Sequence, residues 1–354
     1  MLITVNTTAE ATKRDIIEQA TLRGLMTQAM SDGGANTVIA VGGALPDEIV
    51  ALPGVERVVK AHKPYMLASL DARGTSTIRV GDVQVGGGEP VIIAGPCSVE
   101  GRDAQIEVAH QVKAAGAVML RGGAFKPRTS PYSFQGLGEL GLQHLADARE
   151  ETGLPVVTEV MEPDQVELVA SYADVLQVGS RNMANFPLLK KLGHTNRAVL
   201  LKRGFSATLE EFMMSAEYIM AHGNPNVILC ERGIRTADTA FRFNLDLNVV
   251  PGIKAVSHLP VIVDPSHGTG RRDLVQPMSL AGIAAGADGL AIEVHPDPDN
   301  ALSDGFQTIT PGELRRIHTR MLALHRVLVE TGEDMADITP LHPNEAPVSA
   351  MAGA

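Results

Sequence analysis

The order of apolar segments predicts an α/β protein, a TIM (β/α)8 barrel preceded by a small ferredoxin-like α+β domain. After Glu89 the chain repeats one unit eight times: a short apolar strand, a loop and a helix. Near-continuous apolar strands are typical of a parallel sheet that is buried on both faces. Eight βα units over roughly 250 residues are typical of this barrel. The strands are expected at residues 90–95, 117–120, 155–160, 174–179, 198–204, 227–233, 260–266 and 289–296.

The alternative arrangement is an open, doubly wound parallel sheet. Such a sheet would need fewer strands and a glycine-rich dinucleotide-binding loop after its first strand. The sequence from Gly95 reads GPCSVE, and it lacks the GxGxxG pattern. The closed barrel is therefore the preferred fold.

Residues 1–68 are expected to form the small domain. Strands are predicted at residues 2–6, 37–43 and 55–61, one helix within 8–30, and a short helix within 45–54. This order of elements resembles a ferredoxin-like sandwich. The link between the first helix and the strand at 37–43 leaves little room for another strand, which predicts a shortened version of the sandwich. The domain would serve ligand sensing or assembly, or it would only pack against the barrel.

The barrel domain is expected at residues 76–333, and it should open with a β-hairpin. Ile78, Val80, Val83 and Val85 alternate with polar residues around a Gly-Asp turn, which is typical of two paired strands. The tail, residues 334–354, has several Pro and Ala residues and no period, so it is expected to be an extended arm or a disordered end. Amphipathic helices between the strands are expected, for example, at residues 137–152, 208–222 and 311–332.

The composition restricts the classes of function. The chain has 354 residues, 44% of them hydrophobic and only 3% aromatic, so a large core must be aliphatic. The net charge of -11 argues against nucleic acid or an acidic membrane as the main partner. Two cysteines make no disulfide framework, and no apolar run approaches the ~18 residues that span a bilayer. Without a recognisable signal peptide, the protein is expected to be soluble and cytoplasmic.

The stretch VMLRGGAFKPRTSPYSFQG, residues 118–136, carries the clearest binding signal. Arg121 stands where a buried strand becomes a loop, and Lys126 and Arg128 follow on a segment that contains glycine and proline. Three cations on such a loop make an anion site, and phosphate is the usual anion. A solvated basic loop is the alternative interpretation for an isolated KPR sequence.

Charged residues in the remaining strands also gather at the carboxyl ends, where the active sites of TIM barrels lie. In a chain of net charge -11 the cations would focus a positive potential at one mouth, which suits substrates with phosphate and carboxylate groups. These cations are Arg121, Lys126, Arg128, Arg181, Lys202, Arg232 and Arg235.

A second set at the same ends consists of Cys97, His267, Glu293 and Asp304. One thiolate, one imidazole and two carboxylates could together hold a divalent metal, and Mn, Fe, Co and Zn all fit this mixture of donors. Alone, Cys97 would be interpreted as a small core residue and His267 as a loop histidine. The carboxylates could also simply pair with arginines, but the convergence of all four at one rim favours the metal.

Several long motifs together resemble 3-deoxy-D-arabino-heptulosonate 7-phosphate (DAHP) synthase, in the short bacterial type with an N-terminal ferredoxin-like domain. They are GPCSVE, LRGGAFKPRTSPYSFQG, VGSRNM, LLKRG, CERGIR, DPSHGTG and EVHPDPDNALSDG, and the similarity runs from about residue 76 to 333. The resemblance implies a metal-dependent transferase of the shikimate pathway to chorismate and the aromatic amino acids. That enzyme condenses phosphoenolpyruvate with erythrose 4-phosphate and releases phosphate.

The resemblance also implies roles for individual residues. Lys126 would act as a proton donor near the aldehyde, and Glu159 would lie near the reacting carbons through water. Arg128 and Thr129 would hold the phosphate of the aldose. The metal, with manganese expected first and cobalt, iron or zinc also fitting, would be held by Cys97, His267, Glu293 and Asp304. Phosphoenolpyruvate would be held by Arg121, Lys126, Lys202 and Arg232, with Ser180 and Arg181 at its phosphate.

Other members of this barrel group provide alternatives. The related 3-deoxy-D-manno-octulosonate 8-phosphate synthase takes a five-carbon aldose and has a KANRS-like loop. Pro127 in KPRTS favours the four-carbon substrate. A catalytically silent barrel that serves as a partner subunit would be expected to have lost a ligand, and a class II aldolase would have a site dominated by histidine.

The resemblance further implies assembly and regulation. Members of the family form dimers or tetramers, and some DAHP synthase-like chains associate with chorismate mutase. The N-terminal domain of the family can bind aromatic amino acids that inhibit the enzyme. The predicted shortening of this domain leaves feedback control open here.

Overall fold

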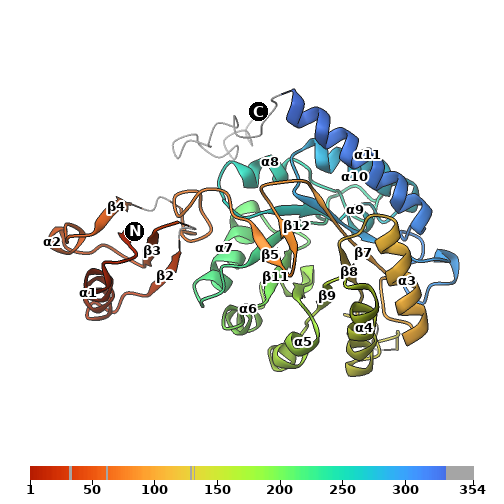
Figure 1. Ribbon diagram of the computed structural model, residues 1–354, viewed down its shortest axis with the longest axis horizontal. Coiled ribbons are helices and arrows are strands. Elements are labelled where there is room, and N and C mark those ends of the chain that lie inside the picture. Colours follow the sequence, from red (N-terminus) through yellow and green to blue (C-terminus); the bar gives the residue numbers. More distant parts are fainter. Residues whose placement is uncertain (32–33, 61–62, 128–129, 131, 332–354) are drawn as a thin grey trace.

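A computed structural model describes residues 1–31, 34–60, 63–127, 130 and 132–331. Two layered units follow one another along the chain, a small sheet with two helices and a larger barrel wrapped by helices (Figure 1). The expected tail at 334–354 lies outside the described residues, as do Arg128 and Thr129. Within the described part of the chain, no helix is both long enough and apolar enough to cross a membrane.

Eight parallel strands close into the barrel that the sequence predicts, in the order β10-β11-β12-β13-β14-β7-β8-β9. All eight expected strands are present at the expected places, somewhat shorter than the apolar segments. They are β7 (Val91–Gly95), β8 (Met119–Arg121), β9 (Val156–Glu159), β10 (Val175–Val178), β11 (Ala198–Lys202), β12 (Val227–Glu231), β13 (Val261–Val263) and β14 (Gly289–Glu293).

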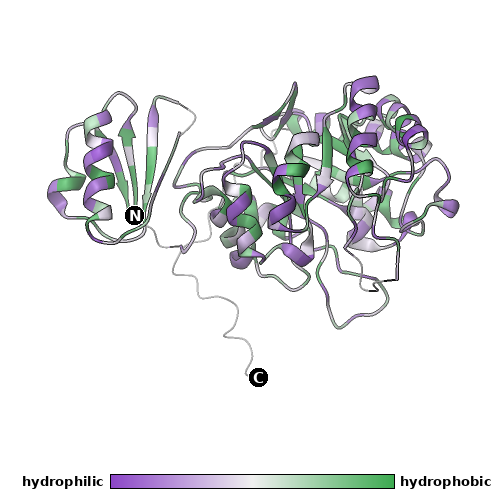
Figure 2. Cartoon of the chain, turned by 90° about the horizontal axis from the view of Figure 1, so that it is seen from below, coloured by the Kyte–Doolittle hydropathy of each residue, from purple (hydrophilic) through white to green (hydrophobic). Residues whose placement is uncertain are grey.

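Helices form the outer layer, and hydrophobic residues on their inner faces pack against the strands, while hydrophilic stretches face outward (Figure 2). The helices expected at 137–152, 208–222 and 311–332 are present close to those positions as α4, α7 and α11. In the described part of the barrel domain, the helices are α3 (Arg102–Ala114), α4 (Glu139–Thr152), α5 (Val166–Tyr172), α6 (Phe186–Gly193), α7 (Leu209–Met220), α8 (Val249–Lys254), α9 (Pro265–Thr269), α10 (Arg272–Ala284) and α11 (Pro311–Glu330). Short 3-10 turns are Pro163–Gln165, Ser180–Asn182 and Pro298–Asn300.

The predicted hairpin, β5 (Ile78–Val80) and β6 (Val83–Val85), closes the amino-terminal end of the barrel. Ile78, Val80 and Val85 join the apolar cluster inside the barrel. The hairpin's glycines lie against prolines that directly precede β9 and β13, which places the hairpin at the strand starts. Water is therefore excluded from that end, and the polar carboxyl end is left as the open mouth.

The N-terminal domain is a four-stranded antiparallel sheet in the order β2-β3-β1-β4, with its own apolar core. Its strands are β1 (Leu2–Asn6), β2 (Thr27–Ser31), β3 (Asn36–Val41) and β4 (Val55–Val59), and its helices are α1 (Glu10–Thr21) and α2 (Asp47–Val50).

The expectation of a shortened sandwich was wrong, because β2 occupies the link that seemed too short for a strand. The helix expected within 8–30 ends at Thr21, and Gly24 turns the chain with a φ of 68°. The TQAMS sequence of β2 was hard to recognise because this edge strand is only partly buried and lacks β-branched apolar residues. The domain therefore has the complete set of ferredoxin-like strands.

Candidate active site

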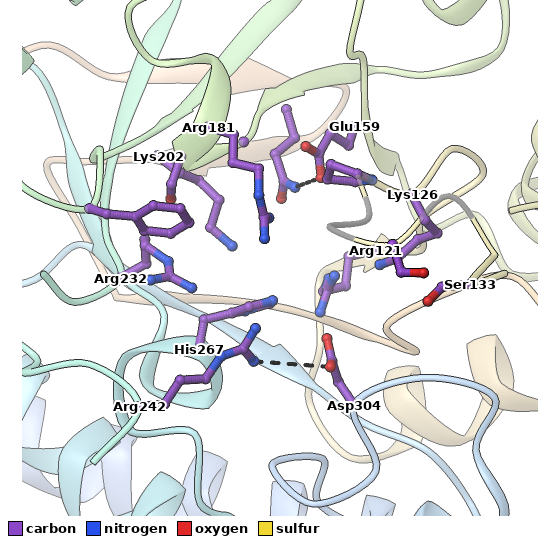
Figure 3. A pocket seen from close by; sticks show the side chains of 16 residues that line it. Arg121, Lys126, Ser133, Glu159, Arg181, Lys202, Arg232, Arg242, His267 and Asp304 are labelled. Atoms are coloured by element: carbon purple, nitrogen blue, oxygen red, sulfur yellow. Dashed lines mark hydrogen bonds and ion pairs between the residues drawn. The ribbon is translucent and has the colours of Figure 1, made fainter. Parts of the chain in front are cut away.

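The carboxyl ends of the barrel strands surround a cavity of about 340 Å³ (Figure 3). Many of the candidate site residues named from the sequence line it. Those that line it are Arg121, Lys126, Glu159, Ser180, Arg181, Lys202, Arg232, His267 and Asp304. Cys97 and Glu293 lie beneath this surface, buried against the residues that line it.

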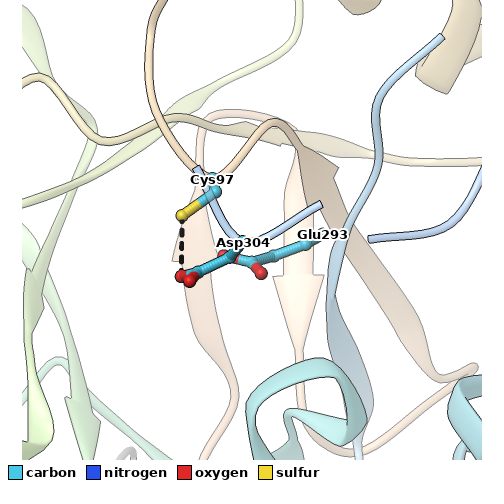
Figure 4. A group of neighbouring side chains, drawn as sticks. All are labelled: Cys97, Glu293 and Asp304. Atoms are coloured by element: carbon cyan, nitrogen blue, oxygen red, sulfur yellow. Dashed lines mark hydrogen bonds between the residues drawn. The ribbon is translucent and has the colours of Figure 1, made fainter. Parts of the chain in front are cut away.

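Three candidate metal ligands form a compact group. The ligand atoms of Cys97, Glu293 and Asp304 all lie within 4.8 Å of one another (Figure 4). The Cys97 thiol donates a 3.2 Å hydrogen bond to Oδ2 of Asp304. The fourth expected ligand, His267, is not within 4.8 Å of all three of these ligand atoms. Its Nε2 is nevertheless 3.4 Å from Oε1 of Glu293.

The orientation of His267 is set by Asp264, which caps the short helix α9. Oδ1 of Asp264 accepts the backbone N–H of His267, and Oδ2 lies 2.8 Å from the ring Nδ1. Lys202 forms an ion pair with the same carboxylate. Burial opposes ionisation of Asp264, but His267 and Lys202 outweigh it and hold the pKa of this carboxyl well below its usual range. Nε2 of His267 is thus directed to the ligand group, as expected for a metal-binding histidine.

A buried carboxylate oxygen supports a cation at this place. Oε2 of Glu293 accepts a hydrogen bond from Gln307, whereas Oε1 receives none from the described residues. Arg121 Nη1 is 2.8 Å from Oε1, but this ion pair lacks hydrogen-bond geometry. Arg121 therefore supplies part of the positive charge that a buried ionised oxygen needs, and a metal ion could supply the rest.

The chemistry of Cys97 gives the same indication. Burial and the nearby Glu293 raise the pKa of its thiol to about 12, although Lys126 and Arg121 oppose this shift. A thiolate ligand at neutral pH would thus need a further positive charge, which a bound metal supplies. Asp304 has a φ of 51° and is the one non-glycine residue with a positive φ among those described. Such strain is characteristic of functional sites.

The cavity wall is strongly cationic, with lysine and arginine side chains from the ends of four strands, β8, β10, β11 and β12. Burial and the neighbouring Arg242 lower the pKa of Arg232 to about 10, with Asp264 acting in the opposite direction, so this side chain remains charged at neutral pH. Fixed cations in a concave site raise the local concentration of anions. Lys126 also connects the two sets of residues, because its Nζ is 3.0 Å from the Cys97 sulfur.

Glu159 at the end of β9 lies beside Gln177 of β10, whose amide donates a 3.3 Å hydrogen bond to Oε2 of Glu159. The residue that directly follows β10, Gly179, must be small. A Cβ atom on Gly179 would lie 2.1 Å from Oε1 of Glu159, so a side chain at Gly179 would displace the carboxylate. Gly179 therefore lets Glu159 project into the cavity.

Several residues that line the cavity were not predicted from the sequence. Phe205 follows the KRG segment, and its ring centre lies 5.4 Å from the Arg181 guanidinium and 5.1 Å from that of Arg232. Arg242 comes from a loop and also lines the cavity. Aromatic residues are scarce in this chain, so Phe205 could have been noticed for its residue type. Arg242 stands on a loop and not at a strand end, so its position in the sequence did not indicate a role in the cavity.

Two predicted groups stand apart from the cavity wall. Arg235 is exposed and is absent from the cavity lining, with its guanidinium 5.0 Å from the Phe205 ring centre. Arg128 and Thr129 lie outside the described residues, but Pro127 and Ser130 on either side of them line the cavity.

The sequence of this chain is similar to that of known proteins. Residues 62–330 match the DAHP synthetase I family. The phospho-2-dehydro-3-deoxyheptonate aldolase of Thermotoga maritima is 53% identical over 285 residues, which cover 79% of this chain and 84% of the relative. The 2-dehydro-3-deoxyphosphooctonate aldolase of Syntrophotalea carbinolica is 32% identical over 276 residues, which cover 71% and 97%.

The fold agrees with solved structures as well. The crystal structure of the DAHP synthase from Thermotoga maritima superposes with a TM-score of 0.74 at 47% identity, covering 92% of this chain and 97% of that one. A truncated form of the enzyme from the same organism gives a TM-score of 0.70 at 48% identity, covering 75% and 97%. The longer match extends the similarity into the N-terminal domain.

Proposed function

The chain belongs to the DAHP synthetase I family, and on that premise we propose that it condenses phosphoenolpyruvate with erythrose 4-phosphate and water to give DAHP and phosphate. The observation that carries the proposal is one cavity in which a compact donor group, Cys97, Glu293 and Asp304, lies beside a cationic wall. The donors suit a divalent metal, and the wall suits two phosphorylated substrates.

The cations would hold the two substrates in a reactive arrangement. We assign phosphoenolpyruvate to Arg121, Lys126, Lys202 and Arg232, with Ser180 and Arg181 at its phosphate. Arg128 and Thr129 are assigned to the phosphate of the aldose. Two anions would otherwise repel each other, so this wall contributes mainly by proximity and orientation.

A divalent metal, for which we propose manganese, would polarise the aldehyde of erythrose 4-phosphate when it is bound to Cys97, His267, Glu293 and Asp304. In the bond-forming step, C3 of phosphoenolpyruvate attacks the aldehyde carbon. Lys126 donates a proton to the oxygen of that aldehyde, for which its place beside Cys97 is suited. Positive charge develops at C2, water adds there, and phosphate leaves with cleavage of its C–O bond.

Glu159 is assigned to that water. Its carboxylate projects into the cavity and is held by Gln177, so it can take a proton from water as the water adds to C2. Arg181 and Lys202 line the same cavity and balance the charge of the leaving phosphate.

The substrate pair is tested with purified protein and phosphoenolpyruvate, to which either erythrose 4-phosphate or arabinose 5-phosphate is added. Phosphate release with the four-carbon aldose alone is expected. Release with arabinose 5-phosphate instead would assign the protein to octulosonate synthesis, the activity in the name of the more distant Syntrophotalea carbinolica relative. Release with neither sugar would favour a silent barrel that acts as a partner subunit.

For the N-terminal domain we propose a role in regulation or assembly. Its complete four-stranded sheet removes the objection that it is too short for such a role. Activity measured with and without tyrosine or phenylalanine tests the regulatory role, and an unchanged rate would reject it. Light scattering of the full chain tests whether it forms a dimer or a tetramer.

A further inference from the structure

Gln307 contacts two members of the ligand group, although it is itself no ligand. Its side chain is fully buried. Its Nε2 donates a 2.6 Å hydrogen bond to Oε2 of Glu293, and its backbone N–H donates to the carbonyl oxygen of Asp304 at 3.2 Å. One residue of the loop that follows β14 therefore holds the carboxylate of Glu293 and the backbone of Asp304.

That loop is fixed at both ends. The hydroxyl of Thr308 donates to the carbonyl oxygen of Asp304, and the backbone N–H of Ile309 donates to the carbonyl oxygen of Glu293. Val294 and Ile309 form a parallel bridge beside β14. The amide of Gln307 is thus held at a fixed distance from the Glu293 carboxylate by the backbone itself.

The other end of the same amide contacts a residue that lines the cavity. Nη1 of Arg242 donates a 2.9 Å hydrogen bond to Oε1 of Gln307. The same nitrogen lies 4.0 Å from Oδ1 of Asp304 (Figure 3). The Arg242 guanidinium also lies 5.6 Å from the ring centre of Phe243. Because an amide donates only through nitrogen and accepts only through oxygen, Arg242 fixes which end of Gln307 faces Glu293.

We propose that Gln307 is a positioning residue for the metal site: it holds the Glu293 carboxylate in place beside Cys97 and Asp304, and Arg242 keeps the Gln307 amide in the required orientation. This inference rests on the metal dependence in the proposed function. It also connects the substrate cavity to the ligand group through one side chain, since Arg242 lines that cavity.

The chain offers a matched control. Gln105 on α3 is also buried, and both polar atoms of its amide lack hydrogen-bond partners among the described residues. Gln307→Met and Gln105→Met remove the same amide and replace it with a side chain of similar volume. A general effect of losing a buried amide would appear in both variants, whereas a positioning effect would appear in Gln307→Met alone.

The test measures Mn²⁺ binding to chelator-treated full-length protein by electron paramagnetic resonance, without any substrate. Removal of a residue that holds a metal ligand typically weakens metal binding about 10–100-fold. We expect that loss for Gln307→Met and wild-type affinity for Gln105→Met. Gln307→Asn, which keeps an amide but shortens its reach, should weaken binding in the same direction and serves if Gln307→Met does not fold.

Wild-type affinity in a folded Gln307→Met would overturn the inference, as would equal losses in the Gln307 and Gln105 variants. A wild-type protein that binds no Mn²⁺ would overturn it together with the metal dependence. A wild-type protein that binds Mn²⁺ but does not release phosphate would overturn the proposed reaction alone. The affinity difference between the variants would in that case still support the positioning role.

Discussion

The ammonium group of Lys126 lies 3.0 Å from the sulfur of Cys97 and 2.7 Å from the carbonyl oxygen of the same residue. This contact joins the anion-binding loop after β8 to the ligand group after β7. Gly123 makes it possible, because a Cβ at this position would lie 2.7 Å from Cδ of Lys126. The proton donor and the metal ligand of the proposed reaction are therefore neighbours.

The first prediction concerns Cys97→Ala, which removes one donor from the ligand group. Loss of a residue that merely supports a ligand costs about 10–100-fold in metal affinity, so loss of the ligand should cost at least as much. We expect nearly metal-free protein with almost no activity, measured by elemental analysis and phosphate release. An unchanged metal content would exclude Cys97 as a ligand.

Cys230→Ala is the matched control for this prediction. Cys230 is also buried and reduced, but it belongs to the apolar cluster inside the barrel. Its replacement leaves a small cavity and should lower stability modestly without changing the metal content.

The second prediction concerns Gly179→Ala. The added Cβ would lie 2.1 Å from Oε1 of Glu159, so the carboxylate must move. A displacement of about 1 Å at a reacting group can lower the rate about 100-fold, and we expect a fall in kcat of that order with the metal content unchanged. Gly88→Ala, which would meet no atom within 4 Å, is the control. Wild-type kcat in Gly179→Ala would argue against the role of Glu159.

The third prediction concerns stability at mildly acidic pH. His258 is buried, with Nε2 2.7 Å from the carbonyl oxygen of Leu67 and Nδ1 2.7 Å from the hydroxyl of Ser76. Burial lowers the pKa of this histidine to about 4, with Arg73 contributing in the same direction and Leu67 opposing it. The unfolded chain therefore takes up a proton near pH 6.5, where the folded protein does not.

The folded state is favoured above pH 6.5, and this contribution is lost as the pH falls toward 4. We expect the free energy of unfolding to fall by about 2 kcal/mol between pH 7 and pH 5 from this group alone. The difference in stability between wild type and His258→Gln, measured by urea denaturation, should shrink over that range. A difference that is constant with pH would show that His258 does not titrate between the two states.

The sequence predicted the barrel well because each strand is apolar on both faces, which leaves a continuous signal. Val91–Gly95 and Gly289–Glu293 are buried along their whole length. The edge strand Thr27–Ser31 gave no comparable signal because it is half-exposed. Strand ends also located the cavity, since the polar residues there interrupt otherwise apolar segments.

The supporting residues could not be predicted in the same way. Gln307 and Arg242 are 65 positions apart in the chain, and their contact depends on the conformation of two loops. The positive φ of Asp304, which turns one of these loops, has no sequence signature of the kind that glycine provides. Strand patterns indicate where a site lies, but the geometry that orients its ligands becomes visible only in the structure.

The central claim is that the cationic cavity and the ligand group act together in one metal-dependent condensation. The most direct measurement is phosphate release from phosphoenolpyruvate by chelator-treated protein with erythrose 4-phosphate, before and after Mn²⁺ is added. We predict no release before the addition and sustained turnover afterwards, with one DAHP formed for each phosphate. Full turnover without metal, or none with Mn²⁺ bound, would contradict the account.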